Sequence, residues 1–326
     1  MLEHGGQVRR AMRQYGIAMD DWLDLSTGIN PDGWPAPPLP PGIWQHLPQD
    51  DDDLHTAAQK YYGATELLAM AGSQAAIQAL PQLRPSSRVA LSTPAYAEHA
   101  LAWQRHGHAV TSVPVSGLLQ AAADAEVAVI INPNNPTGEF CGADELLELH
   151  AQLAAKGGWL VVDEAFMDAT PDRSLAPFCP RPGLIVLRSL GKFFGLSGAR
   201  VGFVLAENAV LQPLAELLGP WPLAAPSRWI ATQALRDTAW QNATRKALPV
   251  AAQRLASLLS SHGLSPSGGC NLFQWTRCAD AASMHEQLAR RGILTRLFRD
   301  PLSLRFGLPC GETQWTRLSD SLGRLK

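Results

Sequence analysis

Charged side chains are scarce in this chain, and neither sign predominates. Only 17% of the 326 residues are charged, and 27 basic residues stand against 29 acidic ones, which gives a formal net charge of -2. Such a balance provides no electrostatic attraction to the phosphates of nucleic acid or to an anionic membrane surface. We therefore expect no nucleic acid and no membrane among the partners.

Long apolar runs and paired cysteines are also missing. No run of about 18 apolar residues occurs, which argues against a membrane-spanning helix. The first 16 residues lack the apolar core of a signal peptide. The five cysteines include no C-x-x-C pair, so neither a disulfide framework nor a zinc site is indicated. These absences predict a cytoplasmic protein with reduced thiols and no bound metal.

Lysine is rare too, which narrows the search for a catalytic amine. The 27 basic residues comprise 22 arginines and five lysines, namely Lys60, Lys156, Lys192, Lys246 and Lys326. Lys192 follows a predicted strand and lies in the glycine-containing segment SLGKFFGLSGARVGF. A lysine fixed in such a loop can act as a Schiff-base nucleophile, although an ordinary surface lysine also fits the local sequence.

Apolar residues make up 46% of the sequence and recur in short runs between helical patterns. We predict helices at residues 73–83 and 143–155, and buried strands at residues 67–71, 89–91, 127–131, 159–162, 184–187 and 201–205. Alternating strands and helices favour an α/β fold with a mostly parallel central sheet that is flanked by helices.

The composition changes after residue 215. Four prolines between positions 213 and 226 precede two helical patterns within 227–261, and the segments 269–275, 281–291 and 303–307 indicate a smaller α+β domain. The length is typical of about two domains. We expect an N-terminal arm and part of the small domain in 1–41, a large domain in 42–215 and a small C-terminal domain in 216–326.

Polar residues follow several of the predicted strands, where open parallel sheets bind their ligands. Asp163 ends a strand. Its carboxylate could bind a protonated heterocyclic nitrogen, or the residue could simply cap the following helix or turn. The segment 72–74 opens a helix whose amides suit a phosphate group, and Ser189 and Arg200 would complete a phosphate cup. The acid next to Asp163, Glu164, is not expected to form a metal pair with it, since adjacent strand residues point to opposite sides.

Three motifs together resemble the fold-type I, pyridoxal-phosphate-dependent aminotransferase superfamily. They are NPNNPTG at 132–138, DEAF at 163–166 and SLGKFFGLSGARVGF at 189–203. The resemblance extends over about residues 20–310. It implies the cofactor pyridoxal 5'-phosphate, with Lys192 as the Schiff-base lysine, Asp163 on the pyridine nitrogen, Asn135 on the ring oxygen and Tyr96 stacked on the ring. The residues implied to hold the cofactor phosphate are Gly72, Ser73, Gln74, Ser189 and Arg200.

Two features distinguish subgroups within this superfamily. The aminotransferases usually carry a tyrosine at the position of Phe166, and DEAF resembles the cobalamin-pathway threonine-phosphate decarboxylases more than the related histidinol-phosphate aminotransferases. The N-terminal His4-Gly5-Gly6 and the segment LSTGINP at 25–31 resemble the same decarboxylases. The substrate-binding residues that the resemblance implies are His4, Gly28, Asn30, Arg296 and Arg305.

The implied reaction is the decarboxylation of L-threonine O-3-phosphate to (R)-1-amino-2-propanol O-2-phosphate in cobalamin biosynthesis. The alternative is transamination of histidinol phosphate, which uses the same cofactor pocket. Family likeness also implies a homodimer. One position departs from the pattern: Leu47 stands where relatives often have a tyrosine that reaches the partner's cofactor, and Tyr61 or Tyr62 could replace it. The run 50–53 is expected to be a solvated helix start.

Overall fold

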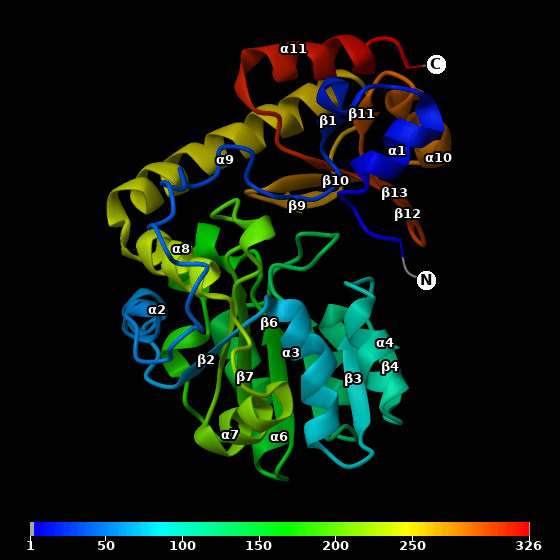
Figure 1. The fold of residues 1–326 in the computed structure, drawn as a ribbon. Coiled ribbons are helices and arrows are strands. Elements are labelled where there is room, and N and C mark those ends of the chain that lie inside the picture. Colours follow the sequence, from blue (N-terminus) through cyan, green and yellow to red (C-terminus); the bar gives the residue numbers. More distant parts are fainter. Residues whose placement is uncertain (1–2, 326) are drawn as a thin grey trace. The chain divides into compact units, whose positions relative to one another are not determined.

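The computed structural model of the protein describes residues 3–325. Its contacts divide the chain into two compact units. The first, which we call the sheet unit, comprises Trp34–Asn135 and Phe140–Asn242. The second, the small unit, comprises the chain up to Gly33, the short segment Pro136–Glu139 and the chain from Ala243 onward. Figure 1 shows the secondary-structure elements of both.

A seven-stranded sheet forms the centre of the sheet unit, with the strand order β2-β8-β7-β6-β5-β3-β4. The strands from β7 to β4 in this order are parallel, and β8 is antiparallel to both β2 and β7. The bounds are β2 Leu67–Met70, β3 Arg88–Ser92, β4 Ala109–Val113, β5 Val127–Ile131, β6 Trp159–Asp163, β7 Leu184–Ser189 and β8 Gly202–Leu205. The predicted, mostly parallel sheet is confirmed.

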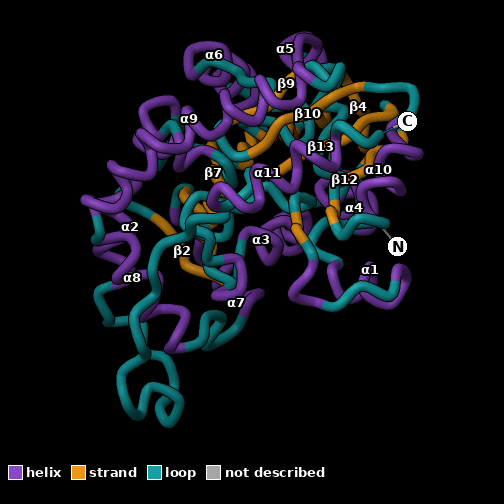
Figure 2. The backbone as a smooth tube through the Cα atoms, turned by 90° about the horizontal axis from the view of Figure 1, so that it is seen from above, coloured by secondary structure: helices purple, strands orange, loops and turns teal. Residues whose placement is uncertain are grey.

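Helices cover both faces of this sheet, and α3 and α6 lie on opposite sides of it (Figure 2). All five residues of β5, Val-Ala-Val-Ile-Ile, are buried, as is typical of a parallel strand that is covered on both faces. The helices of the unit are α2 Leu54–Tyr62, α3 Ser73–Ala79, α4 Glu98–Arg105, α5 Leu118–Ala121, α6 Ala143–Ala154, α7 Asn208–Leu218 and α8 Ala225–Arg236.

Within the seven-stranded sheet, the strand that we did not predict is β4, which lies at one edge. Its sequence Ala-Val-Thr-Ser-Val lacks a continuous apolar run, and its side chains are exposed or half-buried because only one neighbour, β3, pairs with it. An edge strand with this exposure carries little of the hydrophobic pattern by which strands are recognised.

The small unit contains an antiparallel sheet of order β12-β13-β10-β9 and a separate parallel pair, β1 with β11. Its strands are β1 Leu23–Asp24, β9 Gly268–Cys270, β10 Phe273–Arg277, β11 Ile293–Leu294, β12 Arg296–Arg299 and β13 Leu302–Gly307. Its helices are α1 Val8–Tyr15, α10 Ala281–Ala289, α11 Gly311–Leu322 and most of α9 Thr238–Ser261. Among residues 3–325, no helix is both long and apolar enough to cross a bilayer.

The two units are defined by contacts within the structure, whereas the expected domain bounds at 41/42 and 215/216 were inferred from changes in composition. Helix α8 illustrates the difference. It comes after the proline-rich stretch but packs on α2, and contact density therefore places it in the sheet unit. The expected bounds stay a prediction about domain organisation.

Candidate functional site

The predicted cofactor residues of the sheet unit lie at the carboxyl ends of neighbouring strands. Asp163 ends β6 and Ser189 ends β7. Asp163 pairs in register with Ile131 at the end of β5 on one side and with Leu187 on the other. This register brings the start of the NPNNPTG motif beside Asp163, and the amide of Asn132 donates to the Asp163 carbonyl oxygen at 2.9 Å.

Asp163 is buried, and its carboxylate has two defined partners. Oδ2 lies 2.9 Å from Nε2 of His99, and Oδ1 accepts a hydrogen bond from the amide of Ala165 at 3.0 Å. Because an ionised carboxylate can only accept, His99 is the donor of the first contact. The His99 side chain, on α4, is also buried, so the pair is shielded from water. His99 is not among the residues predicted from the sequence, in which its one local signal is its position three residues after Tyr96.

Aromatic rings lie close to Lys192 in space and in sequence. Its Nζ is 5.4 Å from the ring centroid of Phe166, which is itself buried. The next two residues, Phe193 and Phe194, are fully buried and pack on each other with centroids 5.1 Å apart. An amine above an aromatic face gains cation–π stabilisation when it is protonated. Phe166 stands where aminotransferases usually carry a tyrosine. It therefore faces the predicted catalytic amine with an aromatic ring that bears no hydroxyl.

The geometry around Gly72 and Arg200 fits a phosphate cup. Gly72 has a φ of +79°, and a Cβ placed on it would lie 2.8 Å from Nη2 of Arg200. Arg200 is itself in the left-handed region, with a φ of 53°. Its Nη1 donates to the Ser197 carbonyl at 3.0 Å. A side chain at position 72 would fill the space beside the guanidinium, so glycine leaves room there for an anion.

The sheet register brings Ser73 and Ser189 near the same point. Gly202 of β8 pairs with Met70 of β2 and with Ser189 of β7. A Cβ on Gly202 would lie 2.5 Å from the Ser73 amide nitrogen. The two serines that we predicted as phosphate ligands therefore lie on either side of one glycine.

The NPNNPTG loop is fixed by its own side chains. Asn132 Nδ2 donates to the Cys141 carbonyl at 3.1 Å, and Asn132 Oδ1 accepts from the Cys141 amide at 3.0 Å. Asn134 Nδ2 donates to the Pro94 carbonyl at 2.7 Å, which ties the loop to the segment that carries Tyr96. The Tyr96 hydroxyl donates to Gln74 Oε1 at 3.2 Å. These contacts connect the segments that bear Asn135, Tyr96 and Gln74.

Glu164 points away from Asp163 into a buried ionic network. Its carboxylate accepts from Arg188 of β7 and from the Ser174 hydroxyl, and Arg188 also pairs with Asp168. Burial raises the pKa of Glu164, while the Arg188 guanidinium opposes that rise. Removing one partner of such a network leaves an uncompensated buried charge. The network joins β6 and β7 one residue from Asp163 and from Ser189.

Arg296 and Arg305 of the small unit are directly paired across β12 and β13. Opposite residues of an antiparallel pair project to the same face, so the two guanidiniums share one face of this sheet. Arg305 is buried, and its Nη2 donates to the Ser26 carbonyl at 2.7 Å. Burial lowers its pKa to about 10, which leaves it charged at neutral pH. Two guanidinium groups on directly opposite residues of one sheet face are suited to bind anions.

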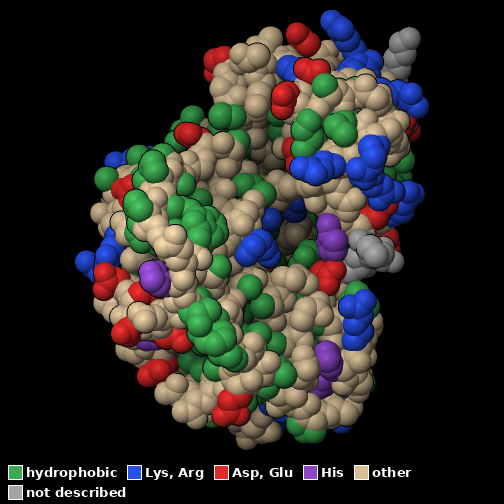
Figure 3. Space-filling model, viewed as in Figure 1, with side chains coloured by type: hydrophobic (Ala, Val, Ile, Leu, Met, Phe, Trp, Pro, Cys, Tyr) green, Lys and Arg blue, Asp and Glu red, His purple; other side chains and the backbone are tan. Residues whose placement is uncertain are grey.

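The other predicted substrate residues also lie in the small unit. His4 and Arg296 line a cavity of about 330 Å³ together with Arg10 and Arg299. Figure 3 shows Lys and Arg side chains gathered over this part of the unit. Asn30 is buried, and its Oδ1 accepts from the Asp32 amide at 3.1 Å.

Gly28 lies close to β13. A Cβ built on Gly307 would be 3.5 Å from the Gly28 nitrogen, so the segment 25–31 runs along the strand that carries Arg305.

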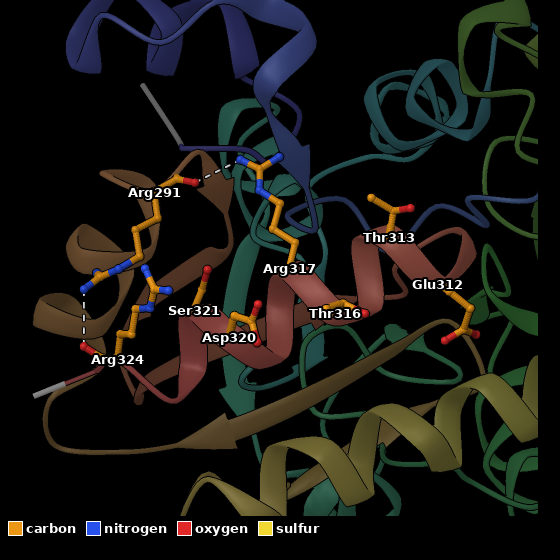
Figure 4. Close-up of a pocket in the computed structure, with 8 residues that line it drawn as sticks. All are labelled: Arg291, Glu312, Thr313, Thr316, Arg317, Asp320, Ser321 and Arg324. Atoms are coloured by element: carbon orange, nitrogen blue, oxygen red, sulfur yellow. Dashed lines mark hydrogen bonds between the residues drawn. The ribbon is translucent and has the colours of Figure 1, made fainter.

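A second cavity, of about 680 Å³, lies along α11 (Figure 4). Two of its arginines, Arg291 and Arg317, donate to backbone carbonyl groups. Arg317 Nη2 donates to the carbonyls of Asp21 and Arg291, and Arg291 Nη2 donates to that of Arg324. These hydrogen bonds satisfy backbone carbonyl oxygens that have no partner within a helix or strand. None of the residues that we predicted for catalysis or binding lines this cavity.

The acidic run 50–53 is more than a solvated helix start. Asp52 binds the buried guanidinium of Arg228 with both oxygens at 2.7 Å, and Asp50 binds it at 2.9 Å. The expectation of a solvated helix start is confirmed, since all four residues are exposed and directly precede α2. The additional contact with Arg228, about 180 residues away on α8, was not predicted. The two candidate replacements for the tyrosine at Leu47 differ in environment: Tyr62 is buried in the core, and the Tyr61 hydroxyl donates to Asp168 at 3.2 Å.

Comparison with known proteins decides the family. The sequence model for aminotransferase class I and II matches residues 41–319. This chain belongs to that family. The fold-type I architecture that we expected from the three motifs is thereby confirmed.

Two relatives and one solved structure are similar to this chain over nearly its whole length. The chain is 53% identical to the threonine-phosphate decarboxylase of Pseudomonas aeruginosa, over 99% of this chain and 97% of that protein. It is 40% identical to the threonine-phosphate decarboxylase of a Sinorhizobium species, over 100% and 98% of the two chains. Among solved structures, the histidinol-phosphate aminotransferase of Sinorhizobium meliloti in complex with pyridoxal-5'-phosphate is similar in fold. Its TM-score is 0.87 at 20% identity, covering 99% of this chain and 95% of that one.

Proposed function

We propose that this protein is a pyridoxal-phosphate-dependent decarboxylase of L-threonine O-3-phosphate, which forms (R)-1-amino-2-propanol O-2-phosphate for cobalamin biosynthesis. The observation that carries the proposal is the pairing of Arg296 with Arg305. Two guanidiniums on one face match a substrate with two anionic groups, a carboxylate and a phosphate ester. The full-length identity to two threonine-phosphate decarboxylases supports this choice of substrate.

The sheet unit supplies the groups that suit the cofactor. Arg200 lies beside the space that Gly72 leaves open, and Ser73 and Ser189 lie next to the neighbouring Gly202, which supports a site for the cofactor phosphate. Asp163, held by His99, would keep a proton on the pyridine nitrogen. The remaining roles belong to Asn135 at the ring oxygen, Tyr96 against the ring, Gln74 at the phosphate and Lys192 at the aldehyde carbon.

The chain's own groups account for the proton movements. Pyridoxal phosphate, when bound, supplies an electron sink for the bond that breaks at Cα. Lys192 is the amine that would deliver the proton replacing the lost carboxylate at Cα. The Phe166 ring below Nζ carries no hydroxyl that could compete for this proton. Arg305 and Arg296, with His4, Gly28 and Asn30, would hold the carboxylate and the phosphate ester.

The proposal includes a homodimer and a cytoplasmic location. Family likeness supports the dimer, and sedimentation of the purified protein measures it. An odd number of cysteines without a C-x-x-C pair supports a reducing location such as the cytoplasm.

Substrate turnover tests the proposed reaction. The cofactor-loaded protein is offered L-threonine O-3-phosphate alone, and separately histidinol phosphate with 2-oxoglutarate. We expect CO2 release from the first without any keto acid, and no glutamate from the second. Glutamate formation without CO2 release would identify an aminotransferase instead.

Substitution of the amine provides the matched control. Lys192→Ala should reduce CO2 release by at least about a thousandfold, because one group serves both as nucleophile and as acid. Lys246→Ala, at an exposed position on α9, should leave the rate unchanged. Equal rates for the two variants would refute the assigned role of Lys192.

A further inference from the structure

Ser26 occupies a central position in the small unit. It follows β1 closely and is almost completely buried. The preceding residue is fixed on both sides, because the Leu25 amide donates to Leu294 and the Leu25 carbonyl accepts from Gly307, at 2.8 and 2.7 Å. The Ser26 backbone is therefore held between β11 and β13.

The Ser26 hydroxyl joins the N-terminal residues to this frame. It donates to Asp24 Oδ1 at 2.6 Å and accepts from the Gly6 amide at 2.7 Å. The directions are settled, because an ionised carboxylate can only accept and an amide N–H can only donate. The Ser26 amide also donates to Asp24 Oδ1, at 2.9 Å. The hydroxyl thus uses its single proton on Asp24 and leaves a lone pair for Gly6.

The Ser26 carbonyl accepts a hydrogen bond from Nη2 of Arg305 at 2.7 Å. The same carbonyl approaches residue 5 so closely that a Cβ on Gly5 would overlap it. Glycine at position 5 therefore allows the N-terminal residues to lie against Ser26. One buried serine thus contacts both the N-terminal residues and a guanidinium that we assign to substrate binding.

The N-terminal residues contact the second arginine as well. Arg296 Nη2 donates to the carbonyl of Glu3. Ser26, His4 and Arg296 line the same cavity of about 330 Å³. Residues 3–6 are therefore attached at one end to Arg296 and at the other to Ser26.

We propose that Ser26 is a positioning residue, which orders residues 3–6 and orients Arg296 and Arg305 for an anionic substrate. This inference rests on the proposed function for the identity of the substrate. Ser26 acts through its hydrogen bonds to the N-terminal segment and to Arg305 and takes no part in the chemistry. Loss of its hydroxyl would release Gly6 and leave Asp24 without a buried donor, while the carbonyl that holds Arg305 would remain.

Two variants of the full-length holoenzyme test the inference. Ser26→Ala removes the hydroxyl, and Gly5→Ala places a methyl group against the Ser26 carbonyl without changing Ser26. Each should raise the KM for L-threonine O-3-phosphate about tenfold and change kcat less than about threefold, as expected for lost positioning of a binding group. Because both variants release the same N-terminal residues from Ser26, the double variant should show a KM like that of either single variant.

Hydrogen exchange gives a readout that does not depend on turnover. Amides of residues 3–12, followed by mass spectrometry, should exchange faster in both variants than in the unaltered protein. Inorganic phosphate should slow this exchange in the unaltered protein but not in the variants. Thr276→Val is the matched control, since it removes another buried hydroxyl of this unit, bonded to the Leu264 carbonyl at 3.1 Å.

The outcomes separate the two proposals. Unchanged exchange in both variants, or KM effects that multiply in the double variant, would overturn the role of Ser26. If the unaltered protein releases no CO2 from threonine phosphate, the proposed function fails. Faster exchange confined to Ser26→Ala and Gly5→Ala would then still support the positioning role.

Discussion

The chemical properties of individual side chains in the sheet unit depend on hydrogen-bond partners that are distant in sequence. Asp163 is the clearest case, because its carboxylate lies beyond the reach of water and depends on His99 and on the Ala165 amide for hydrogen bonds. A buried carboxylate oxygen that loses its donor retains the full cost of its desolvation. His99 therefore contributes to the stability of the site even before a cofactor binds.

Replacement of His99 by leucine tests this dependence. We expect the free energy of unfolding of the cofactor-free protein to fall by about 1–3 kcal/mol, since Oδ2 of Asp163 loses its donor. Asp163→Asn in the same background should recover part of that loss, because an amide carries no charge to desolvate. Urea unfolding of the four proteins in this cycle measures the coupling. Additive effects would mean that the two side chains do not interact.

Helices of the small unit are joined by specific polar contacts as well as by apolar packing. The Tyr15 hydroxyl at the end of α1 donates to Glu286 of α10 at 2.5 Å. Burial, together with this hydrogen bond and the charge of Glu286, raises the pKa of Tyr15 to about 12. The attachment of α1 to α10 depends on a contact between residues 271 positions apart in the sequence.

The pH dependence of stability follows from this raised pKa. Between pH 10 and 12 the folded protein keeps the Tyr15 proton while the unfolded chain loses it, so the contribution of Tyr15 to stability declines as the pH rises. The difference in unfolding free energy between the unaltered protein and Tyr15→Phe should therefore shrink from pH 9 to pH 12. Denaturant unfolding at intermediate pH values measures it. A constant difference would show that the hydrogen bond does not couple to titration.

Over the whole molecule, the cofactor groups come from many separate parts of one unit. Residues 72–74, Tyr96, Asn135, Asp163 and the segment 189–200 meet only when the seven-stranded sheet has formed. A ligand that binds only this assembled state shifts the folding equilibrium toward it. Cofactor binding should therefore be measurable as thermal stability, independently of catalysis.

Thermal unfolding with and without pyridoxal phosphate tests the phosphate cup. At about 100 times its Kd, the cofactor should add roughly 2.7 kcal/mol, which corresponds to an increase in Tm of about 4–6 °C. Pyridoxal, which lacks the phosphate, should give a smaller increase. Arg200→Met should diminish the increase with pyridoxal phosphate and leave that with pyridoxal unchanged. A similar loss with both compounds would place Arg200 outside the phosphate cup.

The sequence by itself determined the α/β fold and the identity of the cofactor-binding candidates. It did so because buried parallel strands are short apolar runs, and because ligand groups follow their carboxyl ends. Lys192 and Asp163 were found by this local pattern. Only the tertiary structure decided that His99 supports Asp163 and that Arg296 pairs with Arg305. These contacts join residues on different elements, and no local periodicity records which charged or polar side chain will be buried against which partner.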